Sequence, residues 1–163
     1  MVHANGRDPV RDAVKAGCDS VEHGFFMGRE NLDRMASCGT AWVPTACTMS
    51  ACSRIFPPGS DEAAGARRTL DHQVLQIMEA RRAGVTIVLG TDSGGPGVLH
   101  GRSAAMEIGI FLDAGMTPQE AVRCATWNGA ELLGLSHWTG LLIHAHKVIP
   151  QFFLQGIRPV VLV

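Results

Sequence analysis

The sequence has no excess of charge of either sign. Among 163 residues, Lys and Arg number 14 and Asp and Glu number 15, which gives a formal net charge of −1 at pH 7. Proteins that bind nucleic acids neutralise phosphates with clustered Lys and Arg, and no such cluster occurs along this chain. We therefore expect no nucleic-acid partner.

Long apolar runs are also missing. No stretch approaches the ~18 uninterrupted apolar residues needed to span a bilayer, and the segment 1–7 lacks the apolar region of a secretion signal. With 46% hydrophobic residues, the composition is that of an ordinary globular domain with one core. We expect no membrane contact and a cytoplasmic location.

The cysteines lack the spacing of a disulfide framework or of a zinc finger. Their number is five, which is odd, and no two are spaced as Cys-x-x-Cys. A metal shared by Cys47 and Cys52 is a weak alternative, because no second pair of cysteines accompanies them. Reduced, partly buried thiols are expected at Cys18, Cys38, Cys47, Cys52 and Cys124.

Short apolar runs alternate with longer stretches of helical period, which is typical of β/α units with parallel strands. Glycines beyond the helical stretches, such as Gly17, Gly39 and Gly84, mark their ends. The predicted strands are 2–4, 20–23, 40–43 and 85–89, the predicted helices are 8–16, 29–37, 61–83, 102–114, 118–127 and 129–133, and a long loop is expected at 45–60.

Four strand-helix units are too few to close a barrel. A (β/α)₈ barrel typically takes ~250 residues, so a chain of this length holds about half of one. The predicted fold class is therefore α/β, a partial TIM (β/α)₈ barrel of about four β/α units followed by further helices.

Three polar residues lie at the carboxyl ends of predicted strands: His3, His23 and Asp92. The carboxyl ends of parallel strands form the ligand-binding face of such folds, so these side chains can converge on one point. Two imidazoles and a carboxylate suit a divalent metal such as zinc, which activates water for hydrolysis. The alternative is ordinary hydrogen-bonded histidines and an Asp that forms a turn.

Local sequences around these residues resemble strand-end motifs of the amidohydrolase superfamily. The motifs are His3-Ala4-Asn5-Gly6, Asp19-Ser20-Val21-Glu22-His23-Gly24 and Gly90-Thr91-Asp92-Ser93-Gly94, in the order of the family's fifth, sixth and eighth strands. The chain is most similar to the imidazolonepropionase-related group, which includes prolidase-like dipeptidases. Segments Val43-Pro44-Thr45, His100-Gly101 and 114–121 carry this closer likeness, which covers about residues 1–142.

The resemblance implies a role for each of these residues. His3 and His23 would ligate one metal ion, zinc first among the divalent metals, while Asp92 would ligate metal and act as the general base. His100 is a candidate for substrate contact or an ordinary solvated loop histidine, and a structural role is expected for Glu22. The implied activity is hydrolysis of a carbon-nitrogen bond in a small amide, dipeptide or cyclic amide.

The chain also departs from the family pattern. The family's first-strand His-x-His pair and fourth-strand lysine have no counterpart in this sequence, and the match fails from about His144. We expect residues 1–135 to form the C-terminal half of an amidohydrolase barrel and residues 136–163 to form a divergent tail in place of β-sandwich strands. His144-x-His146 is an alternative source of the missing pair, by permutation or dimer exchange.

Three interpretations therefore stay open at the level of sequence. The chain is a truncated metal-dependent hydrolase, a catalytically inactive fragment, or a non-enzymatic module. In the last case exposed sheet edges would pair with a partner or with a second copy of the chain.

Overall fold

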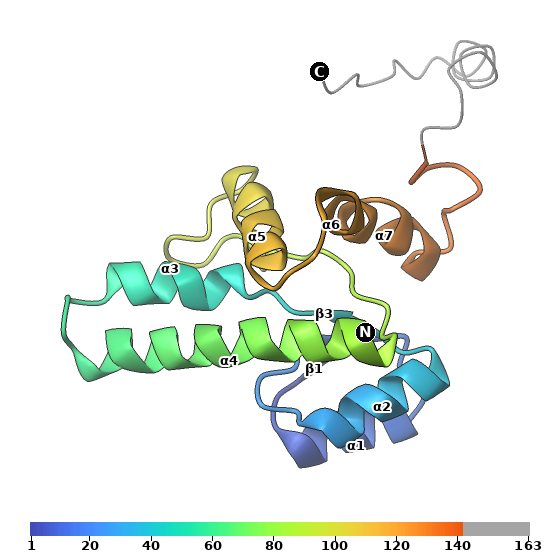
Figure 1. The fold of residues 1–163 in the computed structure, drawn as a ribbon, viewed down its shortest axis with the longest axis horizontal. Helices are drawn as coiled ribbons and strands as arrows, with labels where there is room; N and C mark the ends of the chain where they lie inside the picture. The colour runs from blue at the N-terminus through green and yellow to red at the C-terminus, as the bar shows by residue number, and fades with distance from the viewer. Residues whose placement is uncertain (142–163) are drawn as a thin grey trace, which may run out of the picture.

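Three short parallel strands form the sheet of this protein, whose computed structural model describes residues 1–141 (Figure 1). β1 (Val2–Ala4), β2 (Ser20–His23) and β3 (Ala41–Val43) lie in chain order across the sheet. The register places Ala4 opposite His23. The first three predicted strands are confirmed, and because the strands are parallel, their carboxyl ends lie at the same edge of the sheet.

The first two connections are helices that lie side by side (Figure 1). α1 (Arg7–Lys15) follows β1 and buries Val10, Ala13 and Val14, the helical spacing that faces a core. α2 (Arg29–Cys38) follows β2 and ends at Gly39, whose φ of 73° is left-handed. Both helices begin and end within two residues of the predicted bounds.

The longest helix, α4 (Asp61–Ala83), has the predicted bounds. The Ser60 side chain accepts a hydrogen bond from the backbone N–H of Ala63 at its start, and Gly84 ends it with a left-handed φ of 80°. Acidic residues in its first turn and Arg81 and Arg82 in its last turn oppose the helix dipole favourably.

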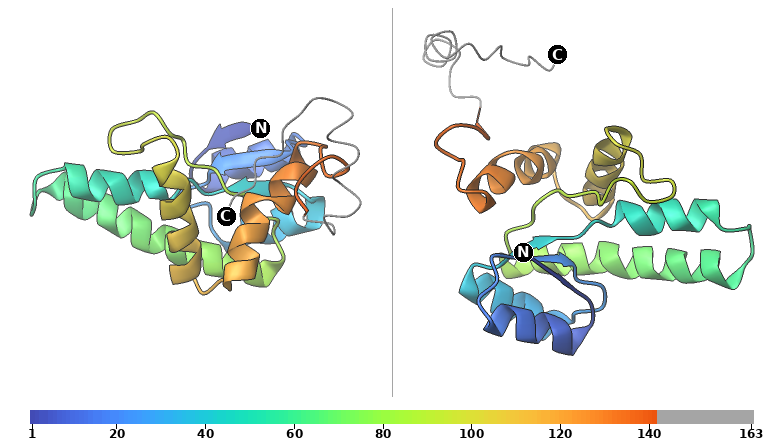
Figure 2. Two further views of the ribbon diagram at one scale, coloured as in Figure 1. Left: turned by 90° about the horizontal axis from the view of Figure 1, so that it is seen from above. Right: turned by 180° about the vertical axis from the view of Figure 1, so that it is seen from behind.

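The predicted loop at 45–60 is wrong over most of its length, because it contains α3 (Cys47–Ile55). α3 runs alongside α4 in every view of the fold (Figures 1 and 2). Its first backbone donors, the N–H groups of Ala46 and Cys47, reach the carboxylate of Glu107 at 3.0 and 2.7 Å. Because Glu107 lies about 60 residues later in the sequence, the residues next to α3 contain no capping motif that would predict the start of this helix.

The predicted strand at 85–89 is wrong in extent. In the described part of the chain this segment contributes one parallel bridge to the sheet, between Ile87 and Trp42. The N–H of Val85 instead donates to α4 at the Ala80 carbonyl, and the N–H of Leu89 donates to the Cys124 carbonyl. Only the middle of the segment is left to pair with β3, through hydrogen bonds of 2.9 Å on either side of Trp42.

The remaining helices lie beyond β3, at the side of the strands away from α1 and α2 (Figure 1). They are α5 (Arg102–Asp113), α6 (Pro118–Ala125) and α7 (Trp127–Leu132), close to the predicted bounds. α6 begins with a capping box in which Thr117 and Glu120 exchange hydrogen bonds. Apolar side chains therefore cover both faces of β3, with Trp42 in the main core and Ala41 and Val43 in a smaller cluster that includes Leu132.

The tail expected at 136–163 falls mostly outside the described residues, and so do His144 and His146. Within residues 1–141, every helix is too short or too polar to cross a bilayer.

Candidate functional site

His3 and His23 meet at the carboxyl edge of the sheet. They come from adjacent parallel strands, and their ring centroids lie 4.4 Å apart with an interplanar angle of 63°. The His3 ring is exposed and the His23 ring is partly buried. Nδ2 of Asn5 lies 3.4 Å from Nε2 of His3, while Oδ1 of Asn5 accepts from the N–H of Phe25 at 2.9 Å. Asn5 thus links the loops after β1 and β2.

Strained backbone is concentrated at this edge. Among residues 1–141, four residues other than glycine have a positive φ, and three of them are His23 at 65°, Thr45 at 49° and Asp92 at 50°. Such conformations cost roughly 1–3 kcal/mol each and persist where surrounding contacts enforce them, commonly at functional sites. For Thr45 the branched Cβ makes the conformation especially unfavourable. The fold therefore stores strain in the loops that follow β2, β3 and the 85–89 segment.

Buried groups of α4 and β3 hold the strained loop after β2. The carbonyl oxygen of His23 accepts from Nε1 of Trp42 at 3.0 Å and from Nε2 of Gln73 at 2.8 Å. One turn further along α4, Nε2 of Gln76 donates to the Gly24 carbonyl at 2.8 Å, and Oε1 of Gln76 accepts from the N–H of Met27 at 3.1 Å. These bonds fix the backbone from which the His23 ring projects.

The loop after β3 is held from two sides. Nε2 of Gln73 donates to the Pro44 carbonyl at 3.2 Å, and the Glu107 carboxylate of α5 accepts the N–H groups of Ala46 and Cys47. Between them, Oγ1 of Thr45 lies 2.7 Å from Nδ1 of His23 and 2.8 Å from the Pro44 carbonyl oxygen. Thr45 thus links the loop after β3 directly to the ring of His23.

Burial and charge shift the ionisation of this region. Burial lowers the pKa of His23 below its ordinary value, and the neighbouring His3 lowers it further, against the opposite effects of Asp92 and Glu22. Burial and His3 thus both favour the neutral form of the His23 imidazole. Burial also raises the pKa of Glu107 to about 7, although hydrogen bonds from Cys47 and Ala46 act in the opposite direction.

Asp92 lies in the exposed loop after the 85–89 segment. Sγ of Cys47 donates to the Thr91 carbonyl at 3.3 Å, which ties this loop to the start of α3. Burial and Glu107 raise the pKa of the Cys47 thiol, so it stays protonated. Asp92 is near enough for its charge to act on His23.

The structure brings together two of the three predicted metal ligands, His3 and His23. Within residues 1–141, no group of three or more His, Cys, Asp or Glu side chains is arranged to hold a metal ion. His100 is exposed at the end of the Asp92 loop, and a Cβ added at Gly94 would lie 3.8 Å from its Nε2. A metal site that includes Asp92, and substrate contact by His100, stay predictions.

Four buried or strained residues of this region were missed as site residues: Thr45, Gln73, Gln76 and Glu107. Thr45 stands in the Val43-Pro44-Thr45 motif, which marked the family but gave no role. The other three are polar residues on helix faces that are otherwise apolar, and that pattern is the signal that could have identified them. In the structure Gln73 and Glu107 are 0% exposed and Gln76 is 2% exposed. Glu22, assigned a structural role, accepts the Ser20 hydroxyl at 2.7 Å.

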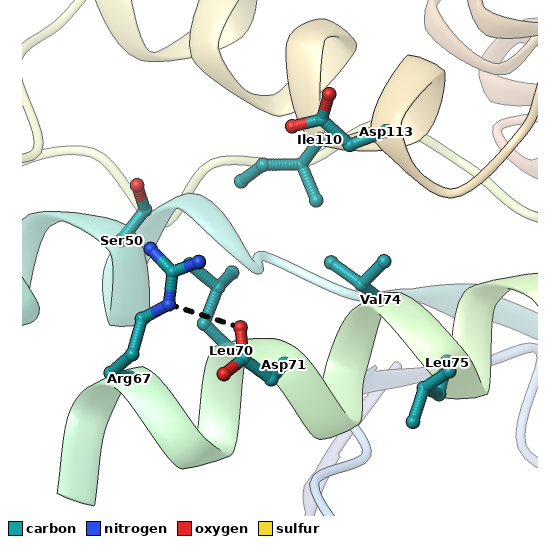
Figure 3. Close-up of a pocket in the computed structure, with 8 residues that line it drawn as sticks. All are labelled: Ser50, Arg67, Leu70, Asp71, Val74, Leu75, Ile110 and Asp113. Carbon is teal, nitrogen blue, oxygen red and sulfur yellow. Dashed lines mark hydrogen bonds and ion pairs between the residues drawn. The ribbon is translucent and has the colours of Figure 1, made fainter. Parts of the chain in front are cut away.

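A separate surface groove of about 540 Å³ lies between α3, α4 and α5 (Figure 3). Its walls include Leu70, Val74 and Ile110, and none of the predicted site residues lines it. Its main polar feature is an ion pair between Arg67 and Asp71, with Nε 3.0 Å from Oδ1. Asp113 adds a further carboxylate to the lining, and the groove has no part in the predicted site.

Parallel strands connected by helices, with two histidines together at the carboxyl ends of the strands, place this chain among α/β proteins of TIM-barrel-like fold with a candidate metal site. The sequence model of the amidohydrolase family matches residues 1–144, and the chain belongs to this family. The resemblance recognised from the strand-end motifs is thereby confirmed.

Solved structures and curated sequences support the same placement. A Xaa-Pro dipeptidase with bound methionine superposes with a TM-score of 0.73 and 32% identity, covering 88% of this chain and 36% of that one. Ochratoxinase from Aspergillus niger superposes with a TM-score of 0.72 and 31% identity, covering 88% of this chain and 32% of that one. An uncharacterized protein of Mycobacterium tuberculosis is 31% identical over 140 residues, which are 81% of this chain and 36% of the relative. The chain thus spans about a third of the length of these proteins.

Proposed function

We propose that this chain contributes to the active site of a metal-dependent amidohydrolase that cleaves the carbon-nitrogen bond of a small amide. The observation that carries the proposal is the pair of rings of His3 and His23, 4.4 Å apart at the carboxyl edge of a parallel sheet. Family membership adds weight, because amidohydrolases generally depend on metal ions.

The donor chemistry of the described residues fits part of such a metal site. His3 and His23 would hold the ion, zinc first among the divalent metals, and Asp92 would complete the contribution of this chain. A bound divalent ion supplies polarisation of the substrate carbonyl and acidification of water. Burial lowers the pKa of His23, which favours the neutral ring that a cation requires.

Asp92 is the proposed general base. Its carboxylate oxygen would accept a proton from the attacking water and return it to the leaving nitrogen. An exposed carboxylate on a strained loop is accessible to both partners of that transfer. His100, later in the same loop, is the proposed contact to substrate.

The proposed substrate class is a dipeptide or another small amide, including cyclic amides. It rests on the names of the relatives above 30% identity, a Xaa-Pro dipeptidase and an ochratoxinase. The proposed architecture is the C-terminal half of the barrel at 1–135, followed by a divergent tail at 136–163. Self-association through the open edge of β1 belongs to the same proposal, and sedimentation of the purified chain tests it.

Zinc titration of the full chain by calorimetry, followed by a dipeptide hydrolysis assay, tests the proposed function. We expect one zinc site that His3→Asn and His23→Asn each abolish, and that Asp92→Asn weakens. His137→Asn is the matched control, because His137 is an exposed histidine outside the site. Hydrolysis of Xaa-Pro dipeptides that depends on zinc and on Asp92 supports the proposal. Zinc binding that survives loss of both His3 and His23 contradicts it.

A second candidate is a family member without catalytic activity. This candidate is favoured because, within residues 1–141, no three His, Cys, Asp or Glu side chains are arranged to hold a metal ion. Zinc binding through His3 and His23 without turnover of any dipeptide would assign the chain to this second function.

A further inference from the structure

We propose that Thr45 is a positioning residue whose hydroxyl accepts a hydrogen bond from Nδ1–H of His23 and so keeps the Nε2 lone pair free for a metal ion. The inference deepens the proposed function and rests on it for the identity of the ligand. It assigns to Thr45 a role that the sequence motif alone did not indicate.

The first step concerns the single proton of the Thr45 hydroxyl. Oγ1 lies 2.8 Å from the Pro44 carbonyl oxygen, which can only accept, and 2.7 Å from Nδ1 of His23. A hydroxyl has one proton to donate and lone pairs to accept with. With the proton directed at the carbonyl oxygen, the bond to His23 requires the proton on Nδ1.

The second step concerns the tautomer of His23. A neutral imidazole carries one proton, so a proton on Nδ1 leaves Nε2 as an acceptor or ligand atom. Histidine ligands generally donate their other N–H to an outer partner, which fixes ring orientation and raises ligand basicity. Thr45 is placed as that partner for His23.

The third step concerns what keeps Thr45 in place. Thr45 is 3% exposed and has a φ of 49°, which a β-branched residue adopts only under constraint. The constraint comes from two fully buried side chains: Gln73 of α4 bonds the Pro44 carbonyl, and Glu107 of α5 bonds the N–H groups of Ala46 and Cys47. Gln73 also bonds the carbonyl of His23, so the same amide sets the positions of both partners.

The direct test is the ¹⁵N spectrum of the histidine rings at pH 8, where neutral imidazole tautomers are distinguished by their two nitrogen shifts. The His23 signal is assigned by its loss in His23→Asn. We expect the Nδ1–H tautomer for the wild-type chain and for Thr45→Ser, which keeps the hydroxyl. Thr45→Val keeps the branched shape without the acceptor, and its His23 should change toward the Nε2–H tautomer. Thr69→Val is the matched control, since Thr69 bonds the Gly65 carbonyl within α4 and should leave His23 unchanged.

An Nε2–H tautomer in the wild-type chain would overturn the proposal, because the Thr45 hydroxyl would then be the donor. An unchanged Nδ1–H tautomer in folded Thr45→Val would overturn it as well. Should Thr45→Val fail to fold, the wild-type and Thr45→Ser spectra decide alone.

Zinc affinity separates this inference from the proposed function. Loss of an outer partner typically weakens metal binding about 10–100-fold, so Thr45→Val should bind zinc that much more weakly, with rescue in Thr45→Ser. If the wild-type chain binds no zinc, the proposed function fails, while the nitrogen spectra still judge whether Thr45 sets the tautomer. Equal zinc affinity in the wild-type chain and Thr45→Val would overturn the proposal.

Discussion

The side-chain amide of Gln73 donates to the carbonyl oxygen of His23 over 2.8 Å. Through this bond the middle of α4 supports the end of β2, where His23 is held at a φ of 65°. Gln73 is 0% exposed and also bonds the Pro44 carbonyl, so one buried amide joins two strained loops.

Gln73→Leu should destabilise the chain by about 2 kcal/mol, because its removal leaves buried acceptors with fewer donors. Urea unfolding measures the change. Gln119→Leu, on the exposed surface of α6, is the control and should stay within about 0.5 kcal/mol of the wild type. Equal effects of the two substitutions would show that the His23 and Pro44 carbonyls do not depend on Gln73.

The ionisation of Glu107 should make stability depend on pH. Its pKa is raised to about 7 in the folded chain, above its ordinary value of 4.5, mainly because the carboxyl group is buried. A raised folded-state pKa means that stability is fully present below about pH 4.5 and is lost as pH rises toward 7. The loss is about 3 kcal/mol at 1.36 kcal/mol per pKa unit.

The unfolding free energy of the wild type minus that of Glu107→Gln isolates this contribution, because Gln does not titrate. That difference should fall by about 3 kcal/mol between pH 4.5 and 7.5. A difference that stays constant with pH would show that hydrogen bonds from Ala46 and Cys47 stabilise the charged carboxylate as well as water does.

The elements that sequence reasoning located correctly are those with local signals. α4 begins after a serine whose side chain caps it and ends at a left-handed glycine, and both features lie within the helix ends themselves. α3 was missed because its first N–H groups are satisfied by Glu107, about 60 residues later in the chain. The strand at 85–89 was predicted too long. Apolar composition does not reveal that the N–H groups of Val85 and Leu89 donate to carbonyl groups of α4 and α6.

The same distinction applies to the site. His3 and His23 were predicted to meet because parallel strands bring their carboxyl ends to one edge, and the structure places their rings together. The role of Thr45 depends on a contact 22 residues away, and that of Gln73 on a contact 50 residues away. No spacing rule connects such residues, since helix packing rather than strand order determines which of them meet.

Ser103→Ala should stabilise the chain. Ser103 is 0% exposed, and its hydroxyl has no hydrogen-bond partner among the described residues. A buried hydroxyl without a partner costs about 1 kcal/mol or more, and alanine also favours the helix α5. Chemical unfolding should therefore show a gain of about 1 kcal/mol.

Ser20→Ala is the matched control for Ser103→Ala. Ser20 is 1% exposed, and its hydroxyl donates to Glu22, so the same substitution should cost about 1 kcal/mol there. Destabilisation by both substitutions would mean that the Ser103 hydroxyl makes a favourable interaction with a group outside residues 1–141 or with water.

Gly24→Ala should destabilise the chain more than Gly17→Ala, and the difference measures how tightly Trp42 is packed against the His23 loop. Both glycines have left-handed φ values, 63° and 77°, so an alanine at either position incurs a conformational cost of about 1–2 kcal/mol. A Cβ at Gly17 would meet nothing within 4 Å, whereas a Cβ at Gly24 would lie 2.7 Å from Nε1 of Trp42 and 2.8 Å from Cε of Met27.

The two contacts at Gly24 differ in how they can be relieved. The methyl group of Met27 ends a flexible side chain and can move, but the Trp42 indole is fully buried and donates to the His23 carbonyl. Moving the indole breaks that bond, so Gly24→Ala should cost about 2 kcal/mol beyond Gly17→Ala in urea unfolding. Equal costs would mean that the indole yields freely, and then the His23 carbonyl would depend on Gln73 alone.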